Sequence, residues 1–325
     1  MPDLMKRIQA LFKKKQDLPT KLPSSLTRIY KVSNHTLGVG SFAVVKLCTH
    51  KKTGQTYALK IVMKKGIAGK EHMLDNELDI LKQVRHPHII SMHGLFEDTQ
   101  AVYIVTDHAK GGELFQQLLR KGSYTEKDAS NLVRQILEGL AYLHEHDIVH
   151  RDIKPENLLF QTTESEDKLM ITDFGLSRII NDHDGILMTA CGTPGYVAPE
   201  ILLRSGHGTP VDLWSVGVIM YTLLSGYTPF WGEDEATLFD NIIGGQYEFD
   251  EEYWCDISAS AKHLIDCFLK KDPGKRITAT EALQHPWISQ GRASATDLIA
   301  NVRKGFTSRQ SFRSFTTAVS QNSKE

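Results

Sequence analysis

The sequence has 325 residues, enough for about two folding units, and its 41% hydrophobic residues are enough for a large core. The four cysteines, Cys48, Cys191, Cys255 and Cys267, form no C-x-x-C pair and no metal-ligand spacing. We therefore expect a reducing compartment, the cytoplasm or the nucleus. No apolar run is long enough to span a membrane, and no secretory or lipid-attachment signal is present, which excludes an integral membrane protein.

The net charge of −1 is unevenly distributed. Residues 1–31 carry a net +6 and residues 291–325 a net +4, which leaves −11 for the middle of the chain. An acidic centre between basic ends indicates basic peptide partners and gives no indication of nucleic-acid binding. Ordinary solvated surface charge is the alternative.

The first third of the chain predicts a small sheet with one helix. Residues 30–61 are rich in Val, Thr, Tyr and Gly and contain turn signals such as Lys52-Thr53-Gly54, which is typical of strands and hairpins. Residues 71–84 have apolar side chains near helical spacing and predict an amphipathic helix. Strands are expected again over 88–106.

The rest of the chain predicts a larger, mainly helical unit. After Gly111-Gly112 an apolar stripe at helical spacing runs through residues 132–143, and residues 211–224 are almost wholly apolar. Residues 262–287 form another helical stretch, and the small and polar residues that follow predict a linker.

A glycine-rich segment lies within the predicted sheet. Glycines let a backbone approach phosphate groups and offer N–H donors, but a simple hairpin turn is the alternative for this segment taken alone. Its residues are Leu37, Gly38, Val39, Gly40, Ser41, Phe42, Ala43, Val44 and Val45.

Lys60 ends the strand pattern Ala58-Leu59-Lys60, where its side chain would point inward. An inward lysine needs a carboxylate partner or a phosphate. Glu77, on the following helix, is the expected partner. A surface lysine and a solvated glutamate are the alternative.

The most specific motif is the octapeptide His150-Arg151-Asp152-Ile153-Lys154-Pro155-Glu156-Asn157. Asp173-Phe174-Gly175 follows, and then Ala198-Pro199-Glu200. With these motifs, residues 30–287 resemble the protein kinase superfamily.

The resemblance implies an α+β, bilobal fold. It comprises a basic N-terminal extension (1–29), an antiparallel N-lobe with one helix (30–106), a hinge (107–111), a mainly helical C-lobe (112–287) and a tail (288–325). ATP would lie between the lobes, bound with Mg²⁺.

The resemblance also assigns the reaction chemistry. Asp152 would be the catalytic base, Lys154 would stabilise the transferring phosphoryl group, and Lys60 and Glu77 would form a catalytic pair. Asn157 and Asp173 would hold the metal, because a hard cation prefers oxygen ligands.

Further residues are assigned to the nucleotide and to support. Thr106 would be the gatekeeper, Asp107 and Ala109 would bond adenine through their backbones, and the residues sandwiching the ring would be Leu37, Val45, Ala58 and Leu159. Glu113 is assigned to the nucleotide site as well. Asp212 would hold the catalytic loop from below, and Glu200 would pair with Arg276.

Three segments are similar to the Ca²⁺/calmodulin-dependent kinase group, closest to type I: residues 111–115, 189–196 and 272–276. The resemblance implies Ser/Thr substrates, with Thr193 bonding Asp152 and Lys154. Glu113 and Glu156 would face the peptide channel and bind an arginine at the third residue before the acceptor.

Regulation is expected at two places. Thr189 matches the activation-loop threonine that an upstream kinase phosphorylates, with Arg151 available to bind the phosphate. The tail alternates apolar and basic residues, typical of a calmodulin-binding, autoinhibitory helix, with Val302, Phe306 and Phe315 as anchors. A membrane-surface or disordered basic tail is the alternative, and a catalytically inactive scaffold is the alternative of a different functional class.

Overall fold

The computed structural model divides the chain into two compact units. Unit 1 takes the described residues up to His72 together with Met92–His108, and unit 2 takes Met73–Ser91 and the described residues from Ala109 onward. The division after His108 falls inside the predicted hinge. The residues that the structure describes are 19, 21–40, 43–69, 71–162, 168–179 and 194–308.

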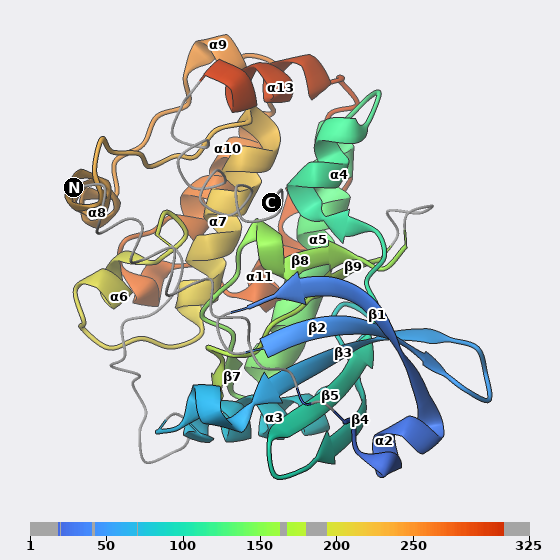
Figure 1. Cartoon of the computed structure of the whole chain (residues 1–325). Helices are drawn as coiled ribbons and strands as arrows, with labels where there is room; N and C mark the ends of the chain where they lie inside the picture. The colour runs from blue at the N-terminus through green and yellow to red at the C-terminus, as the bar shows by residue number, and fades with distance from the viewer. Residues whose placement is uncertain are drawn as a thin grey trace, which may run out of the picture. The chain divides into compact units, whose positions relative to one another are not determined.

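Unit 1 contains a five-stranded antiparallel sheet with the strand order β1-β2-β3-β5-β4 (Figure 1). The predicted sheet is confirmed, and β5 is its most buried strand, which explains its continuous apolar sequence. The elements of this region are α2 (Ser24–Ile29), β1 (Tyr30–Val39), β2 (Ala43–His50), β3 (Thr56–Met63), the 3₁₀ turn η1 (Lys64–Ile67), β4 (Met92–Glu97) and β5 (Ala101–Asp107).

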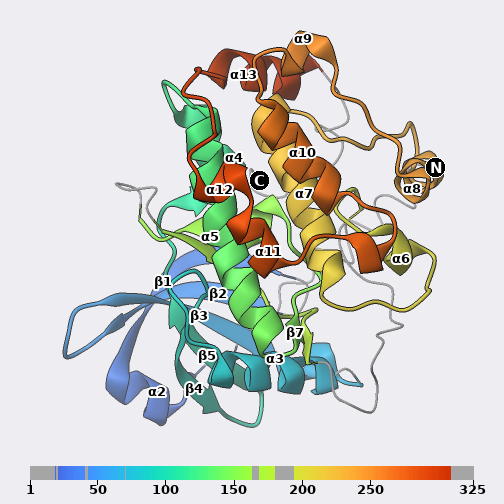
Figure 2. The same cartoon turned by 180° about the vertical axis from the view of Figure 1, so that it is seen from behind.

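Unit 2 is mainly helical, as predicted, and α5 and α7 run through its centre with α10 and α11 against them (Figure 2). Helix α5 begins with a capping box between Thr125 and Asp128. Helix α7 is buried around its whole circumference, which explains why its sequence is apolar on every face. The helices are α3 (Glu71–Gln83), α4 (Leu114–Arg120), α5 (Glu126–Glu145), α6 (Pro199–Leu202), α7 (Pro210–Ser225), α8 (Glu235–Gly244), α9 (Glu251–Trp254), α10 (Ala259–Phe268), α11 (Ala279–Gln284), α12 (Pro286–Ser289) and α13 (Ile299–Ser308).

The helical stretch expected over 262–287 is not continuous. It consists of α10, the 3₁₀ turn η3 (Pro273–Lys275), α11 and α12. Pro273 and Pro286 each stand at the start of a new element, because proline lacks the N–H that would continue a helix.

Short strands position the motif residues of unit 2. Strands β6 (Gly112–Glu113), β8 (Leu158–Phe160) and β9 (Leu169–Ile171) form one small sheet, and β7 (Ile148–Val149) pairs with β10 (Arg178–Ile179). The 3₁₀ turn η2 (Pro155–Asn157) leads directly into β8. The octapeptide therefore runs between β7 and β8, and the Asp173 motif follows β9.

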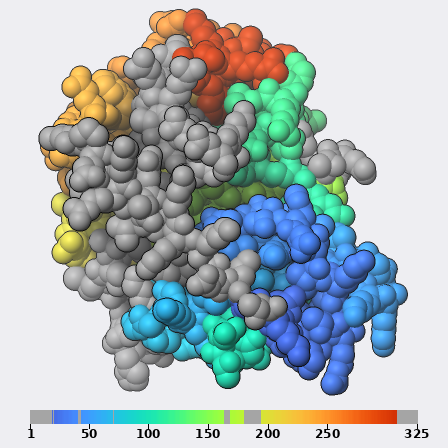
Figure 3. Space-filling view, viewed as in Figure 1, coloured from blue at the N-terminus to red at the C-terminus, as the bar shows by residue number. Residues whose placement is uncertain are grey.

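After the predicted linker, helix α13 packs on the rest of unit 2. It contacts α7 and α9, and its atoms lie against those of α4 (Figure 3). Val302 is fully buried, and Phe306 packs edge-on against Phe115 of α4 with ring centroids 5.3 Å apart. The first part of the predicted tail is thus a docked helix.

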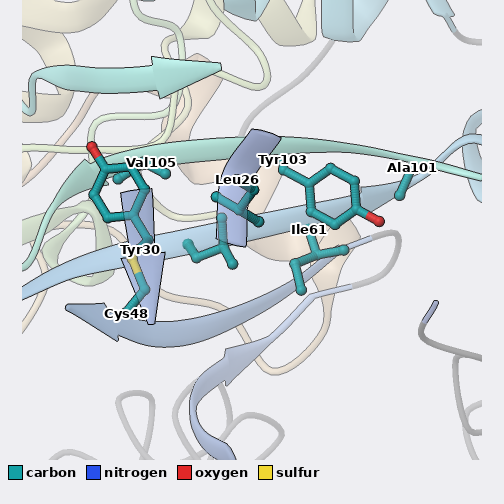
Figure 4. Close-up of a cluster of buried hydrophobic side chains, with 8 residues drawn as sticks. Leu26, Tyr30, Cys48, Ile61, Ala101, Tyr103 and Val105 are labelled. Carbon is teal, nitrogen blue, oxygen red and sulfur yellow. The ribbon is translucent and has the colours of Figure 1, made fainter. Parts of the chain in front are cut away.

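The core of unit 1 includes a segment that the sequence analysis assigned to an N-terminal extension. Leu26 of α2 is 0% exposed and packs with Tyr30, Cys48, Ile61 and Tyr103 of the sheet (Figure 4). Helix α2 therefore belongs to the folded unit.

Among the described residues, no helix combines the length and apolarity needed to cross a membrane.

Candidate active site

The loop after β7 is held from below by Asp212, as predicted. The Asp212 carboxylate, which is fully buried, accepts hydrogen bonds from the backbone N–H groups of His150 (2.9 Å) and Arg151 (2.8 Å) and from His144 Nε2 (2.9 Å). Burial alone would raise the pKa of Asp212, but the hydrogen bond and charge of His144, together with His150, bring it below its ordinary value. Asp212 is therefore an ionised anchor for the loop.

Two residues of the site have left-handed backbone conformations that disfavour an L side chain. Arg151 has φ = 66° and Asp173 has φ = 63°. The N–H of Arg151 bonds Asp212, and the Asp173 carboxylate accepts the N–H of Gly175 at 3.2 Å. Such strain persists only where surrounding contacts enforce it, and it is typical of functional sites.

Asp152, Lys154 and Asn157 come together in one cluster. Lys154 Nζ lies 2.8 Å from Asp152 Oδ2, and Asn157 Nδ2 donates to both the Asp152 carbonyl (2.8 Å) and Oδ2 (3.1 Å). Asp152 is 8% exposed and Asn157 is 6% exposed. The carboxylate is thus fixed by two donors.

A second set of bonds joins this cluster to the segment carrying Asp173. Thr172 donates its N–H (2.9 Å) and its hydroxyl (3.1 Å) to the Asn157 carbonyl. His150 Nδ1 accepts the N–H of Asp152 at 3.3 Å, so Nε2 carries the proton and donates to the Thr172 carbonyl at 3.1 Å. The His150 ring also packs edge-on against Phe174, which is 1% exposed. The structure thus ties the two motifs together within unit 2.

Asn157 and Asp173 fit a magnesium ion by the chemistry of their donors. The Asn157 amide nitrogen is committed to Asp152, which leaves its carbonyl oxygen as the atom for a ligand. Within the described part of the chain, no three His, Cys, Asp or Glu side chains are grouped to hold a metal by themselves. This agrees with Mg²⁺, which usually takes one or two protein oxygens and completes its shell with phosphate and water.

The described residues of the glycine-rich segment lie at the end of β1 and the start of β2, which pair as antiparallel strands in unit 1. Gly38 is opposite Val45, Val39 is opposite Val44, and the Gly40 N–H bonds the Ala43 carbonyl at 2.8 Å. A Cβ built on Gly38 would meet no described atom within 4 Å. Neither packing nor a positive φ explains why glycine stands at this position. The absence of a side chain would instead let a ligand come close to the backbone.

The remaining nucleotide candidates of unit 1 lie on the same sheet. Lys60 is on β3 opposite Ile104 of β5, and Ala58 is opposite Thr106. The Thr106 hydroxyl donates to the Asp107 carbonyl at 3.3 Å. Leu37 is partly exposed, at 37%.

Glu77, the expected partner of Lys60, lies on α3 and is 7% exposed. Lys60 belongs to unit 1 and Glu77 to unit 2, and their pairing stays a prediction. In unit 2, Ala109 follows the division between the units, and Leu159 lies on β8 opposite Glu113 of β6.

Glu113 and Glu156 are close enough to influence each other's charge. Burial raises the pKa of Glu113, the neighbouring Glu156 raises it further, and a hydrogen bond from Gln116 opposes both. Oε2 of Glu156 is buried and has no hydrogen-bond partner among the described residues. The predicted pair therefore forms a negative patch that can accept a further hydrogen bond at Glu156 Oε2.

The predicted ion pair between Glu200 and Arg276 is confirmed. Arg276 Nη1 and Nη2 bond the two carboxylate oxygens at 2.6 and 3.0 Å, and both side chains are at most 5% exposed. The guanidinium also lies over the Trp214 ring, 5.1 Å from its centroid. This bidentate pair ties α6 to the segment before α11.

His207 is a residue that the sequence analysis missed. It is 6% exposed, and its Nε2 has no hydrogen-bond partner among the described residues. Burial and the charge of Arg151 lower its pKa, against the opposing carboxylates of Glu200 and Asp212. One histidine between glycines carries no motif that could have identified it.

Five candidate residues, Ser41, Phe42, Thr189, Thr193 and Phe315, lie outside the described residues.

The chain matches known proteins over most of its length. A family model described as "Protein kinase domain" matches residues 31–288. The chain is 44% identical over 311 residues to a calcium/calmodulin-dependent protein kinase type 1 of Caenorhabditis briggsae, covering 94% of this chain and 87% of the relative. It is 48% identical over 267 residues to a Caenorhabditis elegans protein of the same name, covering 82% and 76%. Calcium/calmodulin-dependent protein kinase cmkB of Emericella nidulans is 49% identical over 285 residues, covering 85% and 70%.

Proposed function

Because the chain belongs to the protein kinase family, we propose that it transfers the γ-phosphoryl group of ATP, with Mg²⁺, to Ser or Thr hydroxyls in basic protein substrates. The observation that carries this proposal is the fixed Asp152 carboxylate, with Lys154 Nζ at 2.8 Å and the Asn157 amide at 3.1 Å. An inactive scaffold would have no need of these groups in this arrangement.

Each residue of the cluster has a distinct task. The carboxylate of Asp152 orients the acceptor hydroxyl and takes its proton as the oxygen attacks phosphorus. The ammonium group of Lys154 neutralises charge on the transferring phosphoryl group. Bound Mg²⁺ would supply further neutralisation of phosphate charge, and Asn157 and Asp173 are the residues that would hold it.

Unit 1 would supply the groups that bind the nucleotide. The glycine-rich segment would let the phosphates approach the backbone at Gly38, and Lys60 would bind a phosphate oxygen while Glu77 holds its charge in place. Leu37, Val45, Ala58 and Leu159 would pack on the adenine, with hydrogen bonds from the backbone at Asp107 and Ala109.

Glu113 and Glu156 would set the substrate preference. Two carboxylates near enough to influence each other's charge favour a guanidinium, which can bond both at once. The buried Glu156 oxygen without a described partner supports this, because a bound arginine would satisfy it. We assign the arginine to the third position before the acceptor, with Thr193 bonding Asp152 and Lys154.

The names of the relatives and the basic tail support regulation by Ca²⁺/calmodulin. Val302 and Phe306, two proposed calmodulin anchors, are packed against unit 2. Calmodulin could use them only after α13 leaves the unit, so binding and release would be coupled. A second control would be phosphorylation of Thr189 by an upstream kinase, with Arg151 binding the phosphate.

The unpaired thiols of Cys48, Cys255 and Cys267 support the cytoplasm or nucleus as the compartment.

The test is phosphorylation of an Arg-x-x-Ser peptide with Mg²⁺ and ATP, with and without Ca²⁺/calmodulin. Asp152→Asn should lower kcat at least ~100-fold, since general-base catalysis contributes about 10² to 10⁴. Asp240→Asn, the same change at an exposed position of α8, is the matched control. A folded wild-type enzyme that phosphorylates no peptide, before or after Thr189 modification, would contradict the proposal.

A further inference from the structure

One exposed serine of this chain has the sequence context that the proposed enzyme would itself recognise. Only two of the arginines are followed three residues later by Ser or Thr: Arg120, by Ser123, and Arg313, by Thr316. The second pair lies outside the described residues. The first lies in the turn between α4 and α5.

The turn presents this sequence accessibly. Arg120 and Ser123 are both exposed. Helix α4 ends at Arg120, and Lys121 already has extended backbone angles of φ −64° and ψ 146°. Gly122 has no described atom within 4 Å of its Cβ position. The residues just before the acceptor are therefore non-helical and open to solvent at Gly122, whereas Tyr124, directly after the acceptor, is buried.

Ser123 lies beside the carboxylate that attaches the tail to this turn. Asp297 Oδ1 accepts the N–H of Tyr124, the residue after Ser123, at 3.0 Å, and backbone hydrogen bonds, with a smaller contribution from the Ser123 side chain, lower the pKa of this carboxyl. The Leu298 N–H bonds the Tyr124 carbonyl at 2.7 Å. Asp297 thus joins the turn to the residues just before α13.

The same carboxylate begins α13. Asp297 Oδ1 accepts the N–H of Ile299, the first residue of the helix, at 3.0 Å. One turn further on, Arg303 Nη2 donates to the carbonyls of Leu119 (3.1 Å) and Lys121 (2.6 Å). Helix α13 is therefore fastened to the α4–α5 turn at Asp297 and at Arg303.

We propose that Ser123 is a phosphorylation site for a kinase that requires arginine at the third position before the acceptor, and that its phosphate releases α13 from unit 2. The release has a regulatory consequence only if the tail acts as proposed above. In the transfer, Ser123 Oγ forms a bond to the γ-phosphorus of ATP. The bond from that phosphorus to the β–γ bridging oxygen breaks, ADP leaves with the electron pair, and the hydroxyl proton passes to the base of the phosphorylating enzyme.

The phosphate opposes docking because it adds a charge of about −1.5 to −2 beside the Asp297 carboxylate. Two neighbouring like charges repel, and because Ser123 and Asp297 are both exposed, this repulsion is strongest at low ionic strength.

Several hydrogen-bond donors around this turn are already engaged. Nη2 of Arg303 bonds two carbonyls. In the first turn of α5, the Lys127 N–H bonds the Ser294 carbonyl at 3.1 Å, and the Asp128 N–H bonds the Thr125 hydroxyl at 3.2 Å. The N-terminus of α5 therefore has these donors occupied and does not offer them to a phosphate.

The direct test uses the full chain, treated with ATP and a Ser/Thr kinase that phosphorylates Arg-x-x-Ser peptides. Mass spectrometry should find phosphate on Ser123, and Arg120→Ala should abolish it while Ser123 remains. Hydrogen exchange of the amides of 299–308, measured without calmodulin and at low ionic strength, should become about two- to fivefold faster, because a like charge is added beside Asp297. No phosphate on Ser123 under conditions that label the control peptide overturns the proposal.

A double-mutant cycle tests the mechanism. Ser123→Asp should speed exchange of 299–308, Ser123→Ala should change it little, and Ser123→Asp should add little once Asp297→Asn has removed the like charge. Thr280→Asp, at an exposed threonine of α11, controls for added charge. Slower exchange after phosphorylation would mean that the phosphate strengthens docking, and the inference would be wrong.

The Ser123 proposal and the proposed function can be refuted independently of each other. If Ca²⁺/calmodulin activates the enzyme while phosphorylated Ser123 leaves the protection of 299–308 unchanged, the Ser123 inference is overturned and the proposed function stands. If phosphorylation frees 299–308 while peptide phosphorylation responds neither to this nor to calmodulin, the site is supported and the regulatory part of the proposed function is wrong.

Discussion

Replacing Asp212 with Asn tests the link between a buried anchor and the reacting carboxylate. Asp212 Oδ1 accepts the Arg151 N–H at 2.8 Å, while Oδ2 accepts the His150 N–H at 2.9 Å and His144 Nε2 at 2.9 Å. An asparagine has one acceptor oxygen. If that oxygen keeps the two donors at the Oδ2 position, the amide NH₂ faces the N–H of Arg151, and two donors oppose each other.

The energetic cost of Asp212→Asn follows from this hydrogen-bond geometry. A buried hydrogen bond to a charged group contributes about 1.5–3 kcal/mol, and the Arg151 N–H would have no acceptor in its place. Arg151 also has φ = 66°, a conformation that costs roughly 1–2 kcal/mol and that this bond helps to hold. We expect the catalytic-loop conformation to be destabilised by about 2–4 kcal/mol, which is roughly 30- to 1000-fold in population.

Steady-state kinetics and urea unfolding measure the two consequences. The kcat of Asp212→Asn should fall at least ~10-fold while KM for ATP changes little, because Asp152 follows directly on Arg151 whereas the nucleotide groups of unit 1 are untouched. Asp240→Asn, at an exposed position of α8, should leave both properties unchanged. A stable Asp212→Asn protein with wild-type kcat would refute the reasoning.

The pH dependence of stability gives an independent check. The folded pKa of Asp212 is below its ordinary value, so its contribution is present above the unfolded-state pKa of about 4 and disappears as pH falls through the lower folded value. The stability difference between wild type and Asp212→Asn should therefore shrink only below about pH 4. A difference that instead vanished between pH 6 and 8 would contradict the assignment to Asp212.

Three further predictions rest on other contacts. Because burial and Glu156 raise the pKa of Glu113, KM for an Arg-x-x-Ser peptide should rise on acidification at a higher pH than an ordinary carboxyl would give, and Glu113→Gln should remove that dependence. Glu126→Gln should lower the free energy of unfolding by about 1–3 kcal/mol, measured in urea, because the fully buried carboxylate accepts from the Ser258 N–H at 3.0 Å and from a tryptophan indole. Gly305→Ala should speed hydrogen exchange of 299–308, because a Cβ there would lie 2.2 Å from the carbonyl oxygen of Ser225, and unchanged protection would contradict the observed packing.

The clustering of the proposed catalytic residues was predictable, because the chemistry assigned to them requires particular side chains at fixed spacings. Asp152 and Asn157 are five residues apart on one loop, so a short motif contains both, and the structure places them within 3.1 Å. Asp212 and the Glu200–Arg276 pair were also predictable, although their partners are far away in sequence, because the resemblance supplied the pairing. No pattern of spacing alone would have joined residues 76 positions apart.

Contacts outside the motifs were not predictable in this way. Helix α2 has six residues and a single buried one, Leu26, which is too short for a periodic signal. Its burial depends on Tyr30, Ile61 and Tyr103, which converge only when the sheet has formed. His207 is similar, because its environment comes from Arg151, Glu200 and Asp212 on three different segments.

Gly305 shows how tertiary packing can override a local helix propensity. A glycine inside a helix costs about 1 kcal/mol relative to alanine, so by propensity it counts against a helical tail. In the structure α13 is helical through this position, and the Gly305 Cα approaches the end of α7 so closely that a Cβ would collide with the backbone of Ser225 and Gly226. Likewise, a Cβ on Gly226, which has φ = 82°, would collide with the backbone of Val302. Two glycines, one on each element, thus permit backbone contact between α7 and α13. Gly305 therefore weakens α13 as an isolated helix but lets it dock. The free energy of docking, rather than that of helix formation, determines whether α13 stays on the rest of unit 2.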